Sequence, residues 1–138
     1  MNIYFAGAIR GGREKVNDYE KIVNKLQELG NVLTTHVASK QINEKGEKDV
    51  SPMDIFNRDV EWLEQSDLIV AEVSVPSLGI GYELGLAESL GKKIICLYDV
   101  NSEKTLSAMI DGNLYFEIIR YESNEVWRHI CRKCHTYM

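Results

Sequence analysis

The chain has 138 residues, of which 44% are hydrophobic and 27% charged, which suits one globular domain predicted to span residues 1–138. Its 16 basic and 21 acidic residues give a net charge of −5, which disfavours binding to nucleic acid polymers or to an anionic membrane. Its apolar runs are only strand-sized, so no membrane span is expected. The N-terminus enters a strand pattern at once, without a basic flank or cleavage site, so we expect a cytoplasmic protein.

Short apolar runs alternate along the chain with segments of helical periodicity. Strands are expected at 2–8, 31–37, 67–73, 92–100 and 114–121. Helices are expected at 18–30, 54–65, 82–91, 105–110 and near the C-terminus. This alternation predicts an α/β fold, a three-layer sandwich with a five-stranded parallel sheet, in which ligands bind beyond the carboxyl ends of the strands.

Residues 38–50 are polar and aperiodic, which favours a loop, and such a loop can serve as a lid over a binding site. The helix after it has clear start signals. Ser51 is the expected N-cap, Pro52 takes the first helical position, and Asp54 completes a capping box.

Near the C-terminus, HICRKCH combines Cys131, Cys134 and His135 in the spacing used for covalent haem attachment, with His129 close by. That attachment normally needs export, and the chain shows no signal for it. Ile130 and both cysteines also share one helical stripe, so a structural role in a terminal helix is the favoured interpretation.

The stretch PSLGIGYELG, residues 76–85, places small residues and one carboxylate after the third expected strand. One interpretation is dinucleotide binding, with Asp99 as the ribose-binding acid. Against it, Glu83 competes with a pyrophosphate for the same helix N-terminus. The alternatives are that Glu83 only complements the helix dipole, or that Ser77 and Gly79 admit a ligand while Glu83 points into the pocket.

A second acid lies in SPMDIFNRDVEWLEQ. Asp59 interrupts an apolar helical stripe formed by Ile55, Trp62 and Leu63, and a carboxylate on a packed face is costly unless it is paired or used. Pairing with Arg58 is the structural alternative. Two carboxyl groups in unlike environments, one protonated and one ionised, are typical of enzymes that cleave glycosidic bonds.

The first expected strand ends in GAIRGGR, where Arg10 is followed by two glycines. An arginine fork next to open backbone amides suits a phosphate monoester, whereas a solvated surface arginine is the alternative. Tyr4 is either a core residue or places its hydroxyl against a carboxylate. Ser77 and Ser107 are possible phosphate donors, each a weak signal alone.

The motifs YFAGAIRGGR, VLTTHVA, RDVEWLEQSDLIVAEVSVPSLGIGYELG and LSAMI together resemble the 2′-deoxynucleoside 5′-phosphate N-hydrolases of the nucleoside 2-deoxyribosyltransferase superfamily. The resemblance runs from residue 3 to about residue 110. It implies a Rossmann-like, flavodoxin-like fold, a homodimer, no metal or other cofactor, and cleavage of the N-glycosidic bond of deoxynucleoside monophosphates, a small-molecule substrate.

The resemblance also implies residue roles. Glu83 would be the nucleophile at the anomeric carbon, Asp59 the general acid for the departing base, and Tyr4 the residue that orients the nucleophile. The phosphate site would be formed by the amides of Gly7, Ala8 and Ile9 together with Arg10, Ser77, Gly79 and, from the partner subunit, Ser107.

Ala8 departs from the family pattern, which has serine there, and the loss of one hydroxyl weakens a phosphate site by about 1 to 2 kcal/mol if nothing replaces it, without abolishing phosphate binding. Three other functions remain open: a deoxyribosyltransferase that exchanges bases, a non-catalytic nucleotide sensor, and a dinucleotide-dependent oxidoreductase.

Overall fold

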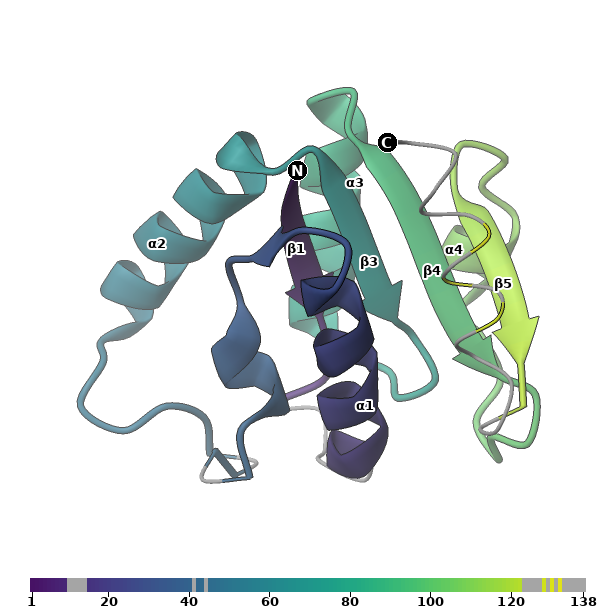
Figure 1. Ribbon diagram of the computed structural model, residues 1–138, viewed down its shortest axis with the longest axis horizontal. Helices are drawn as coiled ribbons and strands as arrows, with labels where there is room; N and C mark the ends of the chain where they lie inside the picture. The colour runs from purple at the N-terminus through teal and green to yellow at the C-terminus, as the bar shows by residue number, and fades with distance from the viewer. Residues whose placement is uncertain are drawn as a thin grey trace.

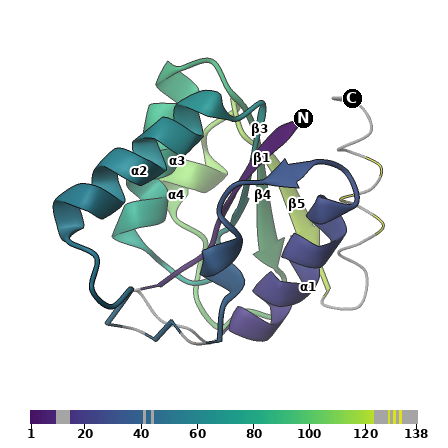
Figure 2. The same cartoon turned by 60° about the vertical axis from the view of Figure 1, so that its left-hand side comes forward.

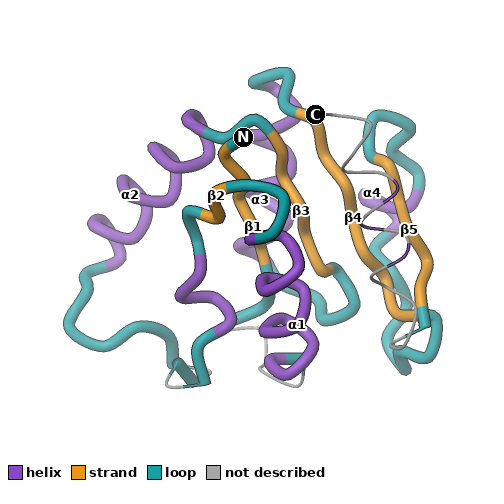
Figure 3. Tube along the Cα trace, viewed as in Figure 1, coloured by secondary structure: helices purple, strands orange, loops and turns teal. Residues whose placement is uncertain are grey.

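The computed structural model describes residues 1–9, 15–40, 42–43, 45–122, 128, 130 and 132. Within them the strands are β1 (Asn2–Ala6), β2 (Asn31–Val32), β3 (Leu68–Glu72), β4 (Lys93–Asp99) and β5 (Glu117–Tyr121) (Figure 3). The helices are α1 (Val16–Gln27), the 3₁₀ helix η1 (Thr35–Ala38), α2 (Pro52–Gln65), α3 (Leu78–Ser89) and α4 (Ala108–Asp111).

The strands form one parallel sheet in the order β2-β1-β3-β4-β5 (Figure 1). Figure 2 shows α1 on one side of this sheet and α2, α3 and α4 on the other. The predicted three-layer α/β fold is therefore confirmed. Because the chain order reverses between β1 and β3, the carboxyl ends of these two strands mark the usual ligand-binding edge of such a sheet.

Alternation along each strand divides the core between the two faces of the sheet. Ile3 and Phe5 of β1 pack with the apolar side of α1. Tyr4 and Ala6 point the other way and belong to the cluster that includes Leu84 of α3. Tyr4 is therefore on the face that α2 and α3 cover.

The second strand is much shorter than predicted. The apolar run 31–37 was expected to be all strand, but the ladder stops after Val32 and η1 begins at Thr35. The cause is Thr34, which is buried. Its hydroxyl accepts from the amide of Phe5 at 2.8 Å and donates to the carbonyl of Phe5 at 2.6 Å, so it takes the backbone groups that a longer strand would have paired.

The helix α3 begins four residues earlier than predicted. The hydroxyl of Ser77 accepts from the amide of Ile80 at 3.3 Å, which makes Ser77 the N-cap. Gly79 and Gly81 are therefore inside the helix rather than in a loop before it. At α2, Ser51 accepts from the amide of Asp54 at 3.1 Å, so the predicted N-cap is correct.

The C-terminal cluster lies mostly outside the described residues, including His129, Cys131, Cys134 and His135. Ile130 is described and is buried in the core on the α1 side of the sheet. Among the described helices, none combines the length and the apolar character that crossing a membrane requires.

The last residue of β3, Glu72, places a buried carboxyl group on the α1 side of the sheet. Glu72 is fully buried, and its Oε1 accepts from the amide of Ser74 at 2.8 Å and from the Ser74 hydroxyl. Its Oε2 has no partner within the described part of the chain. Burial raises the pKa of Glu72 from 4.5 to about 7, although the bonds from Ser74 lower it.

Glu72 should therefore make the fold less stable as pH rises. Both states hold the proton below pH 4.5; between 4.5 and 7 only the folded state keeps it, so its stabilising contribution is lost through this window. In urea titrations the unfolding free energy of the wild type should fall between pH 5 and pH 8. In Glu72→Gln we expect this fall to be smaller by about 2 to 3 kcal/mol. The exposed Glu64→Gln is the control. If the unfolding free energy falls equally with pH in Glu72→Gln and in the wild type, the prediction is contradicted.

Candidate active site

Glu83 and Tyr4 meet between α3 and β1. The Tyr4 hydroxyl forms a hydrogen bond with the Glu83 carboxyl group. Burial first and then the negative charge of Asp59 raise the pKa of Glu83, the bond with Tyr4 lowers it, and the result is a pKa of about 8. The pKa of Tyr4 is raised as well, first by burial and then by both carboxylates, so this hydroxyl stays a donor.

Asp59 lies on the inward face of α2, with its side chain 20% exposed. Its Oδ1 accepts from Arg58 Nε at 2.9 Å. Burial raises the pKa of Asp59, whereas the hydrogen bond and charge of Arg58, and then the charge of His36, lower it; the charge of Glu47 raises it. The predicted apolar stripe holds only in part, because Leu63 is buried while Ile55 and Trp62 are partly exposed.

The structure brings Tyr4, Asp59 and Glu83 together from three elements far apart in sequence. The charge of Asp59 acts on Glu83, and both carboxylates act on Tyr4, so the groups lie within electrostatic reach of one another. Of the two acids Glu83 has the more strongly raised pKa, first because it is more deeply buried, and then because its charged neighbour is a carboxylate where that of Asp59 is a guanidinium. With a pKa of about 8, Glu83 is therefore protonated at neutral pH in the ligand-free protein.

A polar cluster lies next to Asp59. It consists of His36 of η1, Glu47 of the following loop and Arg58 of α2. Arg58 Nη2 is 3.1 Å from Glu47 Oε2 and 3.2 Å from His36 Nε2, and its guanidinium lies 4.8 Å from the ring centre of Trp62. Glu47 Oε1 is 3.2 Å from His36 Nε2. Arg58 therefore bridges two carboxylates, one from the loop and one from α2.

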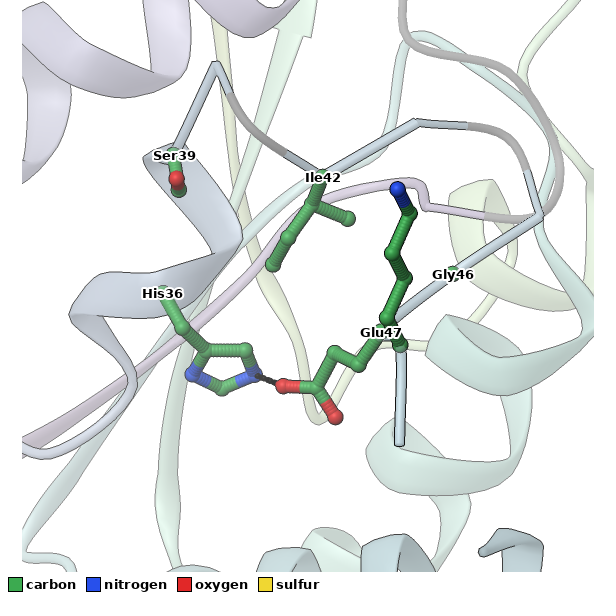
Figure 4. Close-up of a pocket in the computed structure, with 6 residues that line it drawn as sticks. His36, Ser39, Ile42, Gly46 and Glu47 are labelled. Atoms are coloured by element: carbon green, nitrogen blue, oxygen red, sulfur yellow. Dashed lines mark ion pairs between the residues drawn. The ribbon is translucent and has the colours of Figure 1, made fainter. Parts of the chain in front are cut away.

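The same loop borders an open pocket of about 440 Å³ whose lining includes His36, Ser39, Ile42 and Glu47. In Figure 4 the His36 ring and the Glu47 carboxylate point toward each other at the edge of this pocket and form an ion pair. Neither residue is predicted as a site residue from the sequence. The available signal was the polar segment 38–50, which indicated a lid but not which of its side chains would turn inward.

The segment after β1 is only partly described, and Arg10 lies outside the described residues. Ala8 is fully buried, and its amide donates to the Tyr19 hydroxyl at 3.0 Å. A side chain at Gly7 would lie 2.9 Å from the Tyr19 ring, so packing alone requires a glycine there. Ile9 is partly buried against the α1 side of the core. Of the three amides predicted to hold phosphate, the one from Ala8 therefore already has a partner.

The remaining predicted phosphate residues lie at two helix starts. Ser77 caps α3, and Gly79 follows in its first turn, where an added Cβ would make ordinary van der Waals contact with the Ser77 hydroxyl oxygen at 3.8 Å. Ser107 caps α4, is exposed, and accepts from the amide of Met109 at 3.3 Å. The structure of one chain thus brings Ser77 and Gly79 together, and Ser107 lies on a different element.

The dinucleotide interpretation loses its structural basis. Its glycines lie inside α3 instead of in a loop before the helix, and the amide of Gly81 donates to the carbonyl of Ser77 at 3.2 Å. Asp99 is buried and pairs with Lys15 on the α1 side of the sheet. Within the described residues, no three His, Cys, Asp or Glu side chains are grouped to hold a metal ion.

Comparison with known proteins shows the family to which the chain belongs. The family model described as nucleoside 2-deoxyribosyltransferase matches residues 3–127. A 5-hydroxymethyl-dUMP N-hydrolase from Danio rerio is 52% identical, with 91% of this chain and 90% of the relative covered. One of the same name from Homo sapiens is 47% identical, with 90% and 74% covered.

A solved structure, that of the Clostridium botulinum CMP N-glycosidase, superimposes with a TM-score of 0.71 at 22% sequence identity, covering 96% of this chain and 99% of that one. At this identity the likeness supports the fold alone. The resemblance predicted from the motifs is confirmed by the family model and by the relatives. The chain belongs to the nucleoside 2-deoxyribosyltransferase family and is an N-glycosidase.

Proposed function

We propose that this protein hydrolyses the N-glycosidic bond of 2′-deoxynucleoside 5′-monophosphates, releasing the free base and deoxyribose 5-phosphate. The observation that carries the proposal is the convergence of Glu83, Asp59 and Tyr4 on the face of β1 that α2 and α3 cover. The two N-hydrolases at 52% and 47% identity, whose names specify a deoxynucleoside monophosphate, support the same substrate class.

The reaction needs one carboxylate and one carboxylic acid. A Glu83 oxygen attacks the anomeric carbon as the C–N bond breaks, and the bonding electrons go to the base nitrogen, which takes the proton of Asp59. Water then attacks the same carbon, gives a proton to Asp59 and frees the Glu83 carboxylate. Tyr4 holds Glu83 in line through its hydrogen bond. The result is retention at the anomeric carbon.

In the ligand-free protein the proton is on Glu83, not on Asp59, because burial and the charge of Asp59 raise the pKa of Glu83 to about 8. Bound substrate reverses this preference. Positive charge that develops on the sugar favours the Glu83 carboxylate, and ionised Glu83 no longer competes with Asp59 for the proton. The productive charge state is thus reached in the complex.

Base release from a panel of nucleotides tests the proposal. Chromatography should show free base from deoxynucleoside monophosphates at rates well above those for the matching nucleosides and ribonucleotides. A second free base is then added, because the family description raises transfer as the competing reaction. If base exchange greatly exceeds base release, the protein is a transferase; if no nucleotide is cleaved, the proposal fails.

We also propose that the protein acts as a homodimer in which Ser107 reaches the phosphate of the partner's substrate. Exposed apolar side chains gather on the helices of one side of the sheet, a pattern typical of interfaces. Their exposed fractions are 71% for Met53, 50% for Phe56, 97% for Leu78, 58% for Tyr82 and 83% for Met109.

Met109→Asp should separate the subunits, because it places a charge among apolar groups two residues from Ser107. We expect light scattering to give twice the 15.8 kDa chain mass for wild type and a single chain for the variant, together with a raised KM. Leu90→Asp, at an exposed site at the other end of α3, is the control. A monomeric wild type would refute the dimer, and a dimeric Met109→Asp would refute this interface.

A further inference from the structure

We propose that Arg58 and Glu47 are positioning residues that decide which of the two catalytic carboxyl groups carries the shared proton. The inference rests on the roles proposed for Asp59 and Glu83. It concerns two residues outside those roles, one on α2 and one on the loop that follows η1.

Arg58 is a single cation between two carboxylates. Its Nε lies 2.9 Å from Asp59 Oδ1 and its Nη2 lies 3.1 Å from Glu47 Oε2, so one planar fork serves both acids. The guanidinium is fixed in this place by Trp62, whose ring centre is 4.8 Å away. Glu47 is only 11% exposed, so water screens this pairing weakly.

The two partners act on Asp59 in opposite directions. Arg58 stabilises the ionised carboxylate and so lowers the pKa of Asp59, whereas the negative charge of Glu47 raises it. An Asp59 bound to Arg58 alone would be a poor acid at neutral pH. Glu47 offsets part of the Arg58 charge and lets Asp59 accept the proton that Glu83 must lose.

The other charged groups facing Asp59 come from three elements. His36 of η1 contacts both Arg58 and Glu47, at 3.2 Å in each case, and lowers the pKa of Asp59 when protonated. Glu83 of α3 and Tyr4 of β1 complete the group. Because Glu83 holds its proton up to about pH 8, the lower of the two apparent pKa values of the pair follows Asp59.

The test uses variants with opposite expected signs. In the pH profile of kcat/KM, Arg58→Gln should move the acidic limb upward by about 1 pH unit, because Asp59 loses its cation. Glu47→Gln should move the same limb downward, because Arg58 is then left to Asp59 alone. Arg120→Gln, which removes an exposed arginine paired with Asp111 at 2.7 Å, is the matched control and should not move it.

A second readout does not depend on turnover. Carbon-13 NMR of the carboxyl group of Asp59 in the ligand-free protein, assigned with Asp59→Asn, should titrate at higher pH in Arg58→Gln and at lower pH in Glu47→Gln. Shifts of both variants in one direction, or no larger than in Arg120→Gln, overturn the proposal.

The two proposals fail in different ways. If the wild type releases no base, the proposed function is wrong, and the NMR titration still decides the effect of Arg58 and Glu47 on Asp59. If the wild type is active, but neither the acidic limb of the pH profile nor the titration of the Asp59 resonance moves in the Arg58 and Glu47 variants, only the positioning proposal is wrong. Should Arg58→Gln not fold, the downward shift expected of Glu47→Gln decides alone, since Glu47 lies on a loop.

Discussion

Replacing Glu83 by glutamine should abolish base release, with kcat lower by ~10⁴-fold or more, because loss of a nucleophile in well-studied hydrolases costs up to ~10⁶. The amide keeps the size of the side chain and can still accept from Tyr4, so geometry is retained while the negative charge beneath the sugar is lost. The measurement is single-turnover release of base from a deoxynucleoside monophosphate.

The same substitution should leave the fold intact. Burial raises the pKa of Glu83 to about 8, so ionised Glu83 destabilises the folded protein at higher pH, and a neutral amide removes that cost. We expect the thermal midpoint at pH 9 to be no lower than in wild type. Glu88→Gln, in the same helix, is the matched control and should keep full activity. Undiminished release by Glu83→Gln would show that Glu83 is not the nucleophile, whereas a wild type that binds nucleotides and releases no base would favour a nucleotide sensor.

Replacing Asp59 by asparagine should lower kcat for nucleotides by about 10²- to 10⁴-fold, the usual contribution of a general acid. The asparagine cannot protonate the departing base, so the loss should be greatest for the bases that leave least readily as anions. A panel of bases that differ in acidity, measured at one pH, gives this dependence.

A substrate that needs no proton separates the two acids. With 4-nitrophenyl deoxyribose 5-phosphate, whose leaving group departs as a stable anion, Asp59→Asn should retain most of the wild-type rate while Glu83→Gln should not. Equal losses for both substrates in Asp59→Asn would mean that Asp59 orients or binds the sugar instead of protonating the base. Arg120→Gln serves again as the unaffected control.

Local patterns in the sequence predict the elements well where a local cause forms them. Ser51 caps α2 as expected, because its partner amide is only three residues away. The alternation of strands and helices likewise predicts the parallel sheet. The errors fall where distant residues intervene. The hydroxyl of Thr34 ends β2 by bonding the backbone of Phe5, a contact across 29 residues that no periodicity contains.

The sequence alone singled out the two candidate acids, Glu83 in a glycine-rich stretch after a strand and Asp59 among apolar residues of a helix, because a charge that interrupts a local pattern is visible without the fold. Tertiary structure alone decided what surrounds them. It places Tyr4 against Glu83 and makes Arg58 bridge Asp59 to Glu47. The order in which the acids hold a proton depends on burial and on neighbouring charges, and both are set by chain segments that meet only when the sheet and its helices pack.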